Sequence, residues 1–268
     1  MENLSKARWR EHVHVDSSPL NPDYLQQLKN GELSLIVLKG LLSAEKLQYI
    51  QQRIMELHER IEKKDYVNGS LSTFGPYLAK HLNSLDDYFS LANATDDVFN
   101  KLDLRQEVRT YLCDLLSISS LTVAQEKNGK TYAPAIVRVH ADGVSNPLHN
   151  DNIMRDTAHM DLILNKLLTQ LSCIVCIQEC DRGGELRHYA KKWSKEDEVY
   201  KIPDGLGYRS EVVNNIESIS FRPETGDIYL INPTYYHAIA KVAGKDRITL
   251  GFFIGFFEEE MKNGVVWS

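Results

Sequence analysis

A His-x-Asp pair and a distant histidine are the residues of this 268-residue chain best suited to bind a metal ion. His149 and Asp151 are two positions apart, so on an extended segment both side chains point to the same side. His237, far along the chain, can supply a second imidazole from another strand. Two imidazoles and a carboxylate can occupy one face of an octahedral Fe(II) ion and leave three positions open. The set therefore predicts a non-haem iron site.

An arginine ten residues after His237 could complete such a site. The planar guanidinium of Arg247 can hold a carboxylate through two parallel hydrogen bonds, and Thr249 lies two positions further on the same face of a strand. Each signal alone has a simpler explanation, because His-x-Asp pairs occur on surface loops and single histidines or arginines often serve packing or solubility. Their combination in this order favours the metal site.

The segment that leads into the pair holds further polar candidates. Arg138 and Tyr132 could contact a co-substrate or a substrate, and structural pairing explains them equally well. His140 has no partner in the sequence pattern, which favours a core or surface position. His159 is expected on a helix surface, and Asn150, which points away from its two neighbours, is expected to be structural.

Composition narrows the class of protein. A hydrophobic content of 43% and a charged content of 25% are typical of soluble globular proteins. The net charge of -6 argues against nucleic-acid binding, and no apolar run is long enough to span a membrane. The first residues lack a secretion signal, so we expect a cytoplasmic protein that acts on a small molecule. Its oligomeric state stays open.

The four cysteines do not form a convincing metal cluster. They are Cys113, Cys173, Cys176 and Cys180. Strand alternation places Cys173 and Cys176 on opposite faces, so they could not easily share an ion. We therefore expect buried, reduced thiols.

Hydrophobic spacing and turn residues predict the elements that must position the site. In the first half we expect a strand at 34–39, followed by a helix that has Ser43 as its N-cap and ends at about 63. We then expect a loop at 65–75, which could be a lid or a connector, and a helix from Asp103 or the residue after it to about 117. In the second half we expect strands at 135–140, 170–178, 185–189, 218–221, 228–231, through His237 and 247–257, with a short helix capped by Asp156 and a charged excursion at 191–215.

Helices that precede a series of short strands indicate an α+β fold. The turn signals between the strands favour a jelly roll, that is, a cupin-like double-stranded β-helix with N-terminal supporting helices. We predict one domain over residues 1–268, in which 1–130 are mainly helical support with a possible lid and 131–268 form the jelly-roll core.

The chain also resembles a known family. The pattern of His149, Asp151, His237 and Arg247 is similar to that of Fe(II)/2-oxoglutarate-dependent dioxygenases, and more closely to the free-standing halogenases of hapalindole-type alkaloid pathways. The similarity covers roughly residues 130–268. It rests on segments 131–138 (TYAPAIVR), 170–172 (QLS), 183–186 (GGEL), 226–227 (GD), 236–237 (YH), 247–249 (RIT), 255–256 (GF) and 267–268 (WS).

The resemblance implies both a cofactor set and a reaction. It implies that 2-oxoglutarate chelates iron through its keto acid end, that Arg247, with help from Thr249, binds the far carboxylate, and that O2 is the oxidant. The halogenases carry glycine where this chain has Asp151, and that glycine makes room for a halide on iron. The carboxylate therefore implies an oxygenase that hydroxylates, or uses the same chemistry for desaturation or cyclisation.

Two other classes stay open at this point. One is a halogenase despite Asp151, and the other is a non-enzymatic jelly roll that binds a metal such as zinc. For an enzyme of this kind the resemblance favours a small-molecule substrate such as an alkaloid, an amino-acid derivative or a nucleotide.

Overall fold

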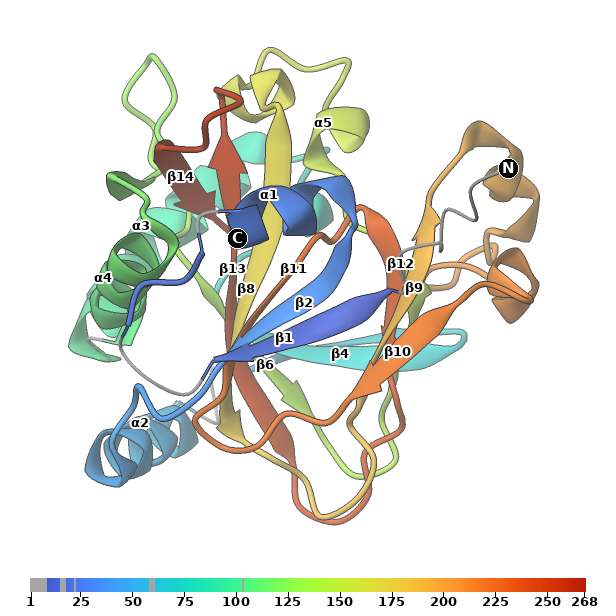
Figure 1. The fold of residues 1–268 in the computed structure, drawn as a ribbon, viewed down its shortest axis with the longest axis horizontal. Coiled ribbons are helices and arrows are strands. Elements are labelled where there is room, and N and C mark those ends of the chain that lie inside the picture. The colour runs from blue at the N-terminus through green and yellow to red at the C-terminus, as the bar shows by residue number, and fades with distance from the viewer. Residues whose placement is uncertain (1–8, 15–17, 22, 58–60, 103) are drawn as a thin grey trace, which may run out of the picture.

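Two mostly antiparallel β-sheets form the body of the molecule in the computed structural model, which describes residues 9–14, 18–21, 23–57, 61–102 and 104–268 (Figure 1). The large sheet contains β1 (Arg10–His14), β2 (Leu33–Leu38), β3 (Glu62–Tyr66), β4 (Gly69–Phe74), β5 (Ser120–Val123), β6 (Ile136–His140), β8 (Thr169–Gln178), β11 (Ile228–Ile231), β13 (Arg247–Phe256) and β14 (Asn263–Trp267). The small sheet contains β7 (Asn146–His149), β9 (Leu186–Lys192), β10 (Ser218–Phe221) and β12 (Tyr235–Ile239). The arrangement confirms the predicted α+β jelly roll.

The helices cover the outer side of the large sheet. They are α1 (Asp23–Asn30), α2 (Ala44–Glu56), α3 (Leu85–Leu102) and α4 (Leu104–Leu116), while the short α5 (Ile153–Asp156) follows β7. In Figure 1, α3 and α4 lie on the left, away from β9, β10 and β12 on the right. The helices therefore leave the space between the two sheets to the strands.

Strand β2 shows how sequence alternation divides the core. All of its residues are buried, because successive side chains enter opposite layers. Ile36 and Leu38 join the apolar layer shared with α1, α2 and α4. Leu35 and Val37 join the layer between the sheets, with residues of β9, β11 and β12 such as Ile239. A continuous apolar run is the expected pattern for a strand buried on both faces.

The N-terminal half differs most from the prediction. Besides the helices α1 to α4, it contributes the strands β1 to β5 to the large sheet. The helix that begins after Ser43 ends at Glu56, and the predicted loop at 65–75 is instead the hairpin β3–β4, paired through β4 to β6. Four of the five residues of β3 are exposed, so no buried face imposes an apolar alternation on the sequence.

Several boundaries in the prediction were right and one was reversed. The N-cap Ser43 accepts a hydrogen bond from the backbone of Lys46 at 3.2 Å, as predicted. Asp156, predicted to begin a helix, is the last residue of α5; the cap is Asn152, whose side chain accepts from Arg155. The helix predicted from Asp103 or the residue after it to about 117 is confirmed as α4, which begins at Leu104; Asp103 itself and the residues 1–8 that were searched for a signal lie outside the described residues. In the described part of the chain no helix is both long and apolar enough to cross a membrane.

Two glycines of β13 give a test of how tightly this frame is packed. A Cβ added at Gly255 would lie 2.6 Å from Leu167 and 2.8 Å from Trp267, whereas at Gly251 the nearest atom is 3.7 Å away. We expect Gly255→Ala to destabilise the protein by about 1–3 kcal/mol. The matched variant Gly251→Ala should be neutral or slightly stabilising. Urea unfolding midpoints measure both, and equal stability of the two variants would contradict this packing.

Candidate metal centre

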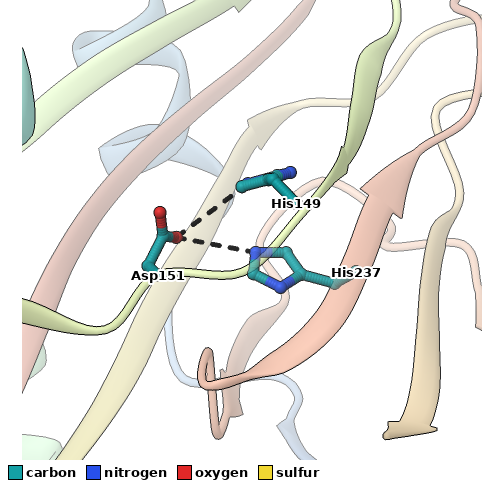
Figure 2. Close-up of side chains that lie close together, drawn as sticks. All are labelled: His149, Asp151 and His237. Carbon is teal, nitrogen blue, oxygen red and sulfur yellow. Dashed lines mark ion pairs between the residues drawn. The ribbon is translucent and has the colours of Figure 1, made fainter. Parts of the chain in front are cut away.

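The pairing of β7 with β12 brings two histidines together. His149 and His237 are direct partners across these antiparallel strands, so their side chains extend from the same face of the small sheet. Their ring centroids are 4.2 Å apart, and both side chains are mostly buried (Figure 2). The strand pairing therefore fixes one edge of a possible metal site.

Backbone carbonyls orient both imidazoles. Nδ1 of His149 lies 2.7 Å from the carbonyl oxygen of Pro147, and Nδ1 of His237 lies 2.9 Å from that of Tyr235. A ring nitrogen that faces a carbonyl must carry the proton, so we assign Nδ1–H as the donor in both rings. Each Nε2 then carries a lone pair, the state in which histidine binds a metal, and the side-chain amide of Asn146 lies 3.4 Å from Nε2 of His149.

Asp151 completes the set from a loop. Its backbone N–H donates to the carbonyl of Pro233 at 2.9 Å, which ties the segment after β7 to the turn before β12. Its Oδ2 lies 3.9 Å from Nε2 of His149 and 3.6 Å from Nε2 of His237, as the dashed lines in Figure 2 indicate. The three possible ligand atoms lie within 4.8 Å of one another. A single divalent ion fits this donor set.

Burial and local charge favour the protonation states that a metal needs. Burial, reinforced by the neighbouring His237, lowers the pKa of His149 to about 4. Burial opposes ionisation of Asp151, but the adjacent His237, together with the charges of His149 and Arg138, outweighs it and lowers the pKa of that carboxyl. At neutral pH His149 is therefore neutral and Asp151 is ionised, so this pair needs to lose no proton before an ion binds.

A cavity opens beside these three residues, between the two sheets. Polar residues of two strands of the large sheet lie on its wall: Arg138 and His140 on β6, and Arg247 and Thr249 on β13. The register pairs Arg247 with His140 and Thr249 with Arg138. Three of these were predicted site residues, and the structure brings them to the same cavity as the metal-ligand candidates.

Arg247 is a deeply buried cation at this wall. It is 2% exposed, and its Nη2 donates a hydrogen bond to the Tyr229 hydroxyl at 2.9 Å. Its Nε has no hydrogen-bond partner within the described residues. A buried guanidinium with unused donors is a suitable anchor for a carboxylate.

A glycine turn packs against the stem of Arg247. Gly184 has a φ of +71°, and a Cβ added there would lie 3.0 Å from Cδ of Arg247 and 2.6 Å from Sγ of Cys180. A Cβ added at its neighbour Gly183 would lie only 1.9 Å from the backbone carbonyl oxygen of Lys241. The paired glycines are therefore required both by backbone conformation and by space.

A second cavity adjoins the first and shares His149, Asp151 and Arg138 with it. Its walls include the apolar side chains of Leu206, Phe253 and Trp267, together with Tyr77. The ring centroids of Phe253 and Trp267 are 5.5 Å apart, and Phe253 also faces both cavities. Tyr77 was not predicted, because nothing in its local sequence distinguishes it from a core tyrosine.

The β3–β4 hairpin reaches the rim of this second cavity. The side-chain amide of Asn68, between the two strands, donates to the carbonyl of Leu206 and accepts from its N–H, both at 2.8 Å. Because Leu206 lines the cavity, the hairpin supports one of its walls. The predicted lid role of this segment stays a prediction.

Two of the minor predictions need correction. Tyr132 does not reach the cavity, because its ring packs among Tyr88 and Phe89 and its hydroxyl bonds to Glu126. His140 is buried, as predicted for a core position. Its side chain lines the cavity, however, and does not pack only against apolar residues. The sequence could not distinguish these two environments.

The expectations for Asn150 and the cysteines agree with the structure. Asn150 is buried and accepts a hydrogen bond from Arg155 at 2.6 Å. All four cysteines are free, and Cys173 lies in the apolar core. Over the described ranges, His149, Asp151 and His237 form the only group of three such residues arranged to hold a metal ion.

Comparison with known proteins agrees with this arrangement. The sequence profile described as "Carrier-protein-independent halogenase WelO5" matches residues 8–268, so the chain belongs to this family. The fold is shared with a dioxygenase that has been solved with 2-oxoglutarate bound.

Individual relatives are more distant. The chain is 29% identical over 153 residues to an L-isoleucine 3(1)-dioxygenase of Pantoea ananatis (strain AJ13355), covering 54% of this chain and 50% of the relative. It is 26% identical over 155 residues to the leucinostatins biosynthesis cluster protein S of Purpureocillium lilacinum, covering 54% and 61%. The chain thus spans about half to three fifths of the lengths of these relatives.

A solved structure shares the fold over most of the chain. The N-substituted L-amino acid dioxygenase from Burkholderia ambifaria AMMD superposes with a TM-score of 0.61 at 15% identity, covering 92% of this chain and 91% of that one. The same enzyme has been solved in complex with alpha-KG, that is, 2-oxoglutarate, with a TM-score of 0.58. At this identity the likeness shows the fold.

The geometry of the three residues predicts the effect of removing each one. We expect His149→Ala, Asp151→Ala and His237→Ala each to lose most of the iron that the unmodified protein retains, because each change removes one of three ligand atoms. Metal analysis after anaerobic loading with Fe(II) and desalting measures this. The control His159→Ala changes an exposed histidine and should retain iron. Full retention by His237→Ala would remove that residue from the set.

Proposed function

We propose that this protein is an oxygenase that hydroxylates a small-molecule metabolite and converts 2-oxoglutarate to succinate and CO2. His149, Asp151 and His237 would hold Fe(II), while Arg247 and Thr249 would hold the far carboxylate of 2-oxoglutarate. The observation that carries the proposal is the convergence of Oδ2 of Asp151 and two Nε2 atoms beside a cavity with a buried arginine. Family membership supports the cofactor set.

Each residue has a defined task in this function. Iron and 2-oxoglutarate, when bound, supply the oxidising power that activates O2 for attack on a substrate C–H bond. The protein supplies neutral imidazoles from His149 and His237, held by backbone carbonyls, and a carboxylate from Asp151. Arg247 fixes the orientation of the co-substrate, and the closely packed sheets limit access of water to the site.

Asp151 decides between hydroxylation and halogenation in this proposal. Its Oδ2 lies on the side of both Nε2 atoms where a third ligand must bind. A halide would need that position, and the negative carboxylate also repels an anion. By resemblance, the halogenases have glycine there. We therefore favour hydroxylation, or a related desaturation or cyclisation.

Two alternatives have specific support. The halogenase alternative is favoured by the family profile, whose description names that activity. A non-enzymatic metal-binding role would use the same three side chains with another ion, such as zinc. Succinate production that requires both Fe(II) and 2-oxoglutarate separates an enzyme from a metal-binding protein, and the mass of the product separates the two enzymes.

The second cavity is the place that we propose for the substrate. It adjoins His149 and Asp151, and most of its wall is apolar, with the charge of Arg138 at the border. A mostly apolar wall with a few polar groups is typical of a small-molecule site. Relatives named for L-isoleucine and for N-substituted L-amino acids make amino-acid derivatives the first compounds to test.

An untargeted assay tests the function as a whole. A metabolite extract is incubated with the protein, Fe(II) and O2, with and without 2-oxoglutarate, and analysed by mass spectrometry together with succinate. We expect a compound to gain the mass of one oxygen, or to lose two hydrogens, only when 2-oxoglutarate is present. Metal binding without any co-substrate turnover in extracts and amino-acid derivatives would favour the non-enzymatic alternative.

The role of Arg247 gives a quantitative prediction. Arg247→Ala should weaken 2-oxoglutarate binding by about 2–5 kcal/mol, because a buried charge-assisted contact is lost, while iron binding changes little. Calorimetric titration of the anaerobic Fe(II) protein measures both. Arg187→Ala, which removes an exposed arginine of β9, is the matched control. If Arg247→Ala binds 2-oxoglutarate with unchanged affinity, another residue must bind the far carboxylate, and Arg138 is the first to examine.

The identity of the product tests Asp151. With excess chloride present, the unmodified protein should yield an oxygenated product, because the carboxylate occupies the position that chloride needs. Asp151→Gly should open that position and weaken iron binding, and some chlorinated product could then form. A chlorine isotope pattern in the main product of the unmodified protein would instead establish the halogenase alternative and remove Asp151 from the ligand set.

A further inference from the structure

His140 is a buried polar residue to which the proposed function gives no task. It is the last residue of β6, it is 2% exposed, and it lies on the wall of the first cavity. Neither ring nitrogen has a hydrogen-bond partner within the described residues. A neutral imidazole always carries one N–H donor and one acceptor nitrogen, and buried polar atoms in proteins are nearly always paired. The cavity beside His140 is where a partner can bind.

The neighbour of His140 across the sheet is Arg247. The two residues are direct partners in the β6–β13 pairing, so their side chains share the inner face. Arg247 uses one N–H on the Tyr229 hydroxyl, while its Nε lacks a partner in the described part of the chain. An unused imidazole and a partly unused guanidinium therefore lie side by side on the same wall.

The protonation state of His140 makes it a neutral donor. Burial, followed by the charges of Arg247 and Arg138, lowers the pKa of His140 well below its ordinary value. The ring therefore adds an N–H without adding a second cation beside Arg247. A carboxylate, with two oxygens and several lone pairs, can accept from both side chains at once.

We propose that His140 is a further donor, beside Arg247 and Thr249, for the far carboxylate of the co-substrate, so that His140 and Arg247 together select 2-oxo dicarboxylates over 2-oxo monocarboxylates. The inference rests on the proposed function, since it requires 2-oxoglutarate to reach from the metal ligands to Arg247. It assigns to His140 a positioning role through its N–H. If His140 only filled space, its effect on binding would depend on its size and shape and not on its N–H.

Two ligands that differ only at the far end separate these roles. 2-Oxopentanoate has a methyl group where 2-oxoglutarate has its second carboxylate, and it keeps the keto acid end. Both are titrated calorimetrically into the anaerobic Fe(II) protein, so the readout is binding and no turnover is needed. The variants are His140→Phe and the smaller His140→Leu, which both lack the N–H, and His140→Gln and His140→Asn, which each supply one.

We expect the Phe and Leu variants to weaken 2-oxoglutarate binding by roughly ten- to a hundredfold, the usual effect of losing a hydrogen bond to a charged group. Binding of 2-oxopentanoate should be unchanged, which also shows that each variant is folded around an intact metal site. Either the Gln or the Asn variant should recover part of the affinity for 2-oxoglutarate. The control His159→Phe, at an exposed histidine, should match the unmodified protein.

The contrary outcomes are distinct. If the Phe or Leu variant keeps full affinity for 2-oxoglutarate, or weakens both ligands equally, His140 is a packing residue and the inference is wrong. If the unmodified Fe(II) protein binds neither ligand, the proposed function itself fails, and this is visible before any variant is made. Should Phe not be accommodated in the fold, the Leu variant gives the same comparison.

Discussion

The antiparallel pairing of β7 with β12 is the constraint on which the site depends. It places His149 opposite His237, and a shift of the register by one residue would turn one ring to the other face of the small sheet. Backbone carbonyls within the same two strands then hold both Nδ1 atoms. The large sheet serves this arrangement by packing against the inner face, so the imidazoles point into a space enclosed by side chains.

The two sheets contribute opposite charges to the wall of the first cavity. The small sheet and its loops contribute the metal-ligand candidates with the negative charge of Asp151, and the large sheet contributes Arg138 and Arg247. A molecule that chelates a metal ion at one end and carries a negative charge at the other end matches this distribution of charge. The apolar second cavity meets the first at His149 and Asp151, so a second molecule can reach the same point from another direction. Separation of the two cavities keeps charge recognition apart from substrate packing.

Much of this could be predicted from the sequence, for identifiable reasons. The metal-ligand candidates were recognisable because two of them are close in sequence and because their residue types are specific. Strands such as β8, β11 and β13 were recognisable because burial requires apolar runs. The hairpin β3–β4 was missed because its first strand is exposed and polar. His140 was misjudged because the face on which it lies depends on the pairing of β6 with β13, and Tyr132 because its ring packs against Tyr88 and Phe89 of α3; local sequence contains neither contact.

The three metal-ligand candidates are held in different ways, and this has an evolutionary consequence. Both histidines belong to paired strands, so replacing either one also disturbs a packed sheet. Asp151 follows the end of β7, and the chain is held there by its backbone N–H on Pro233, a bond that any residue except proline can make. The residue type at position 151 can therefore change while the backbone contact that holds this segment is kept. A lineage with this fold can gain or lose an anion-binding position through one codon, so its chemistry can diverge faster than its architecture.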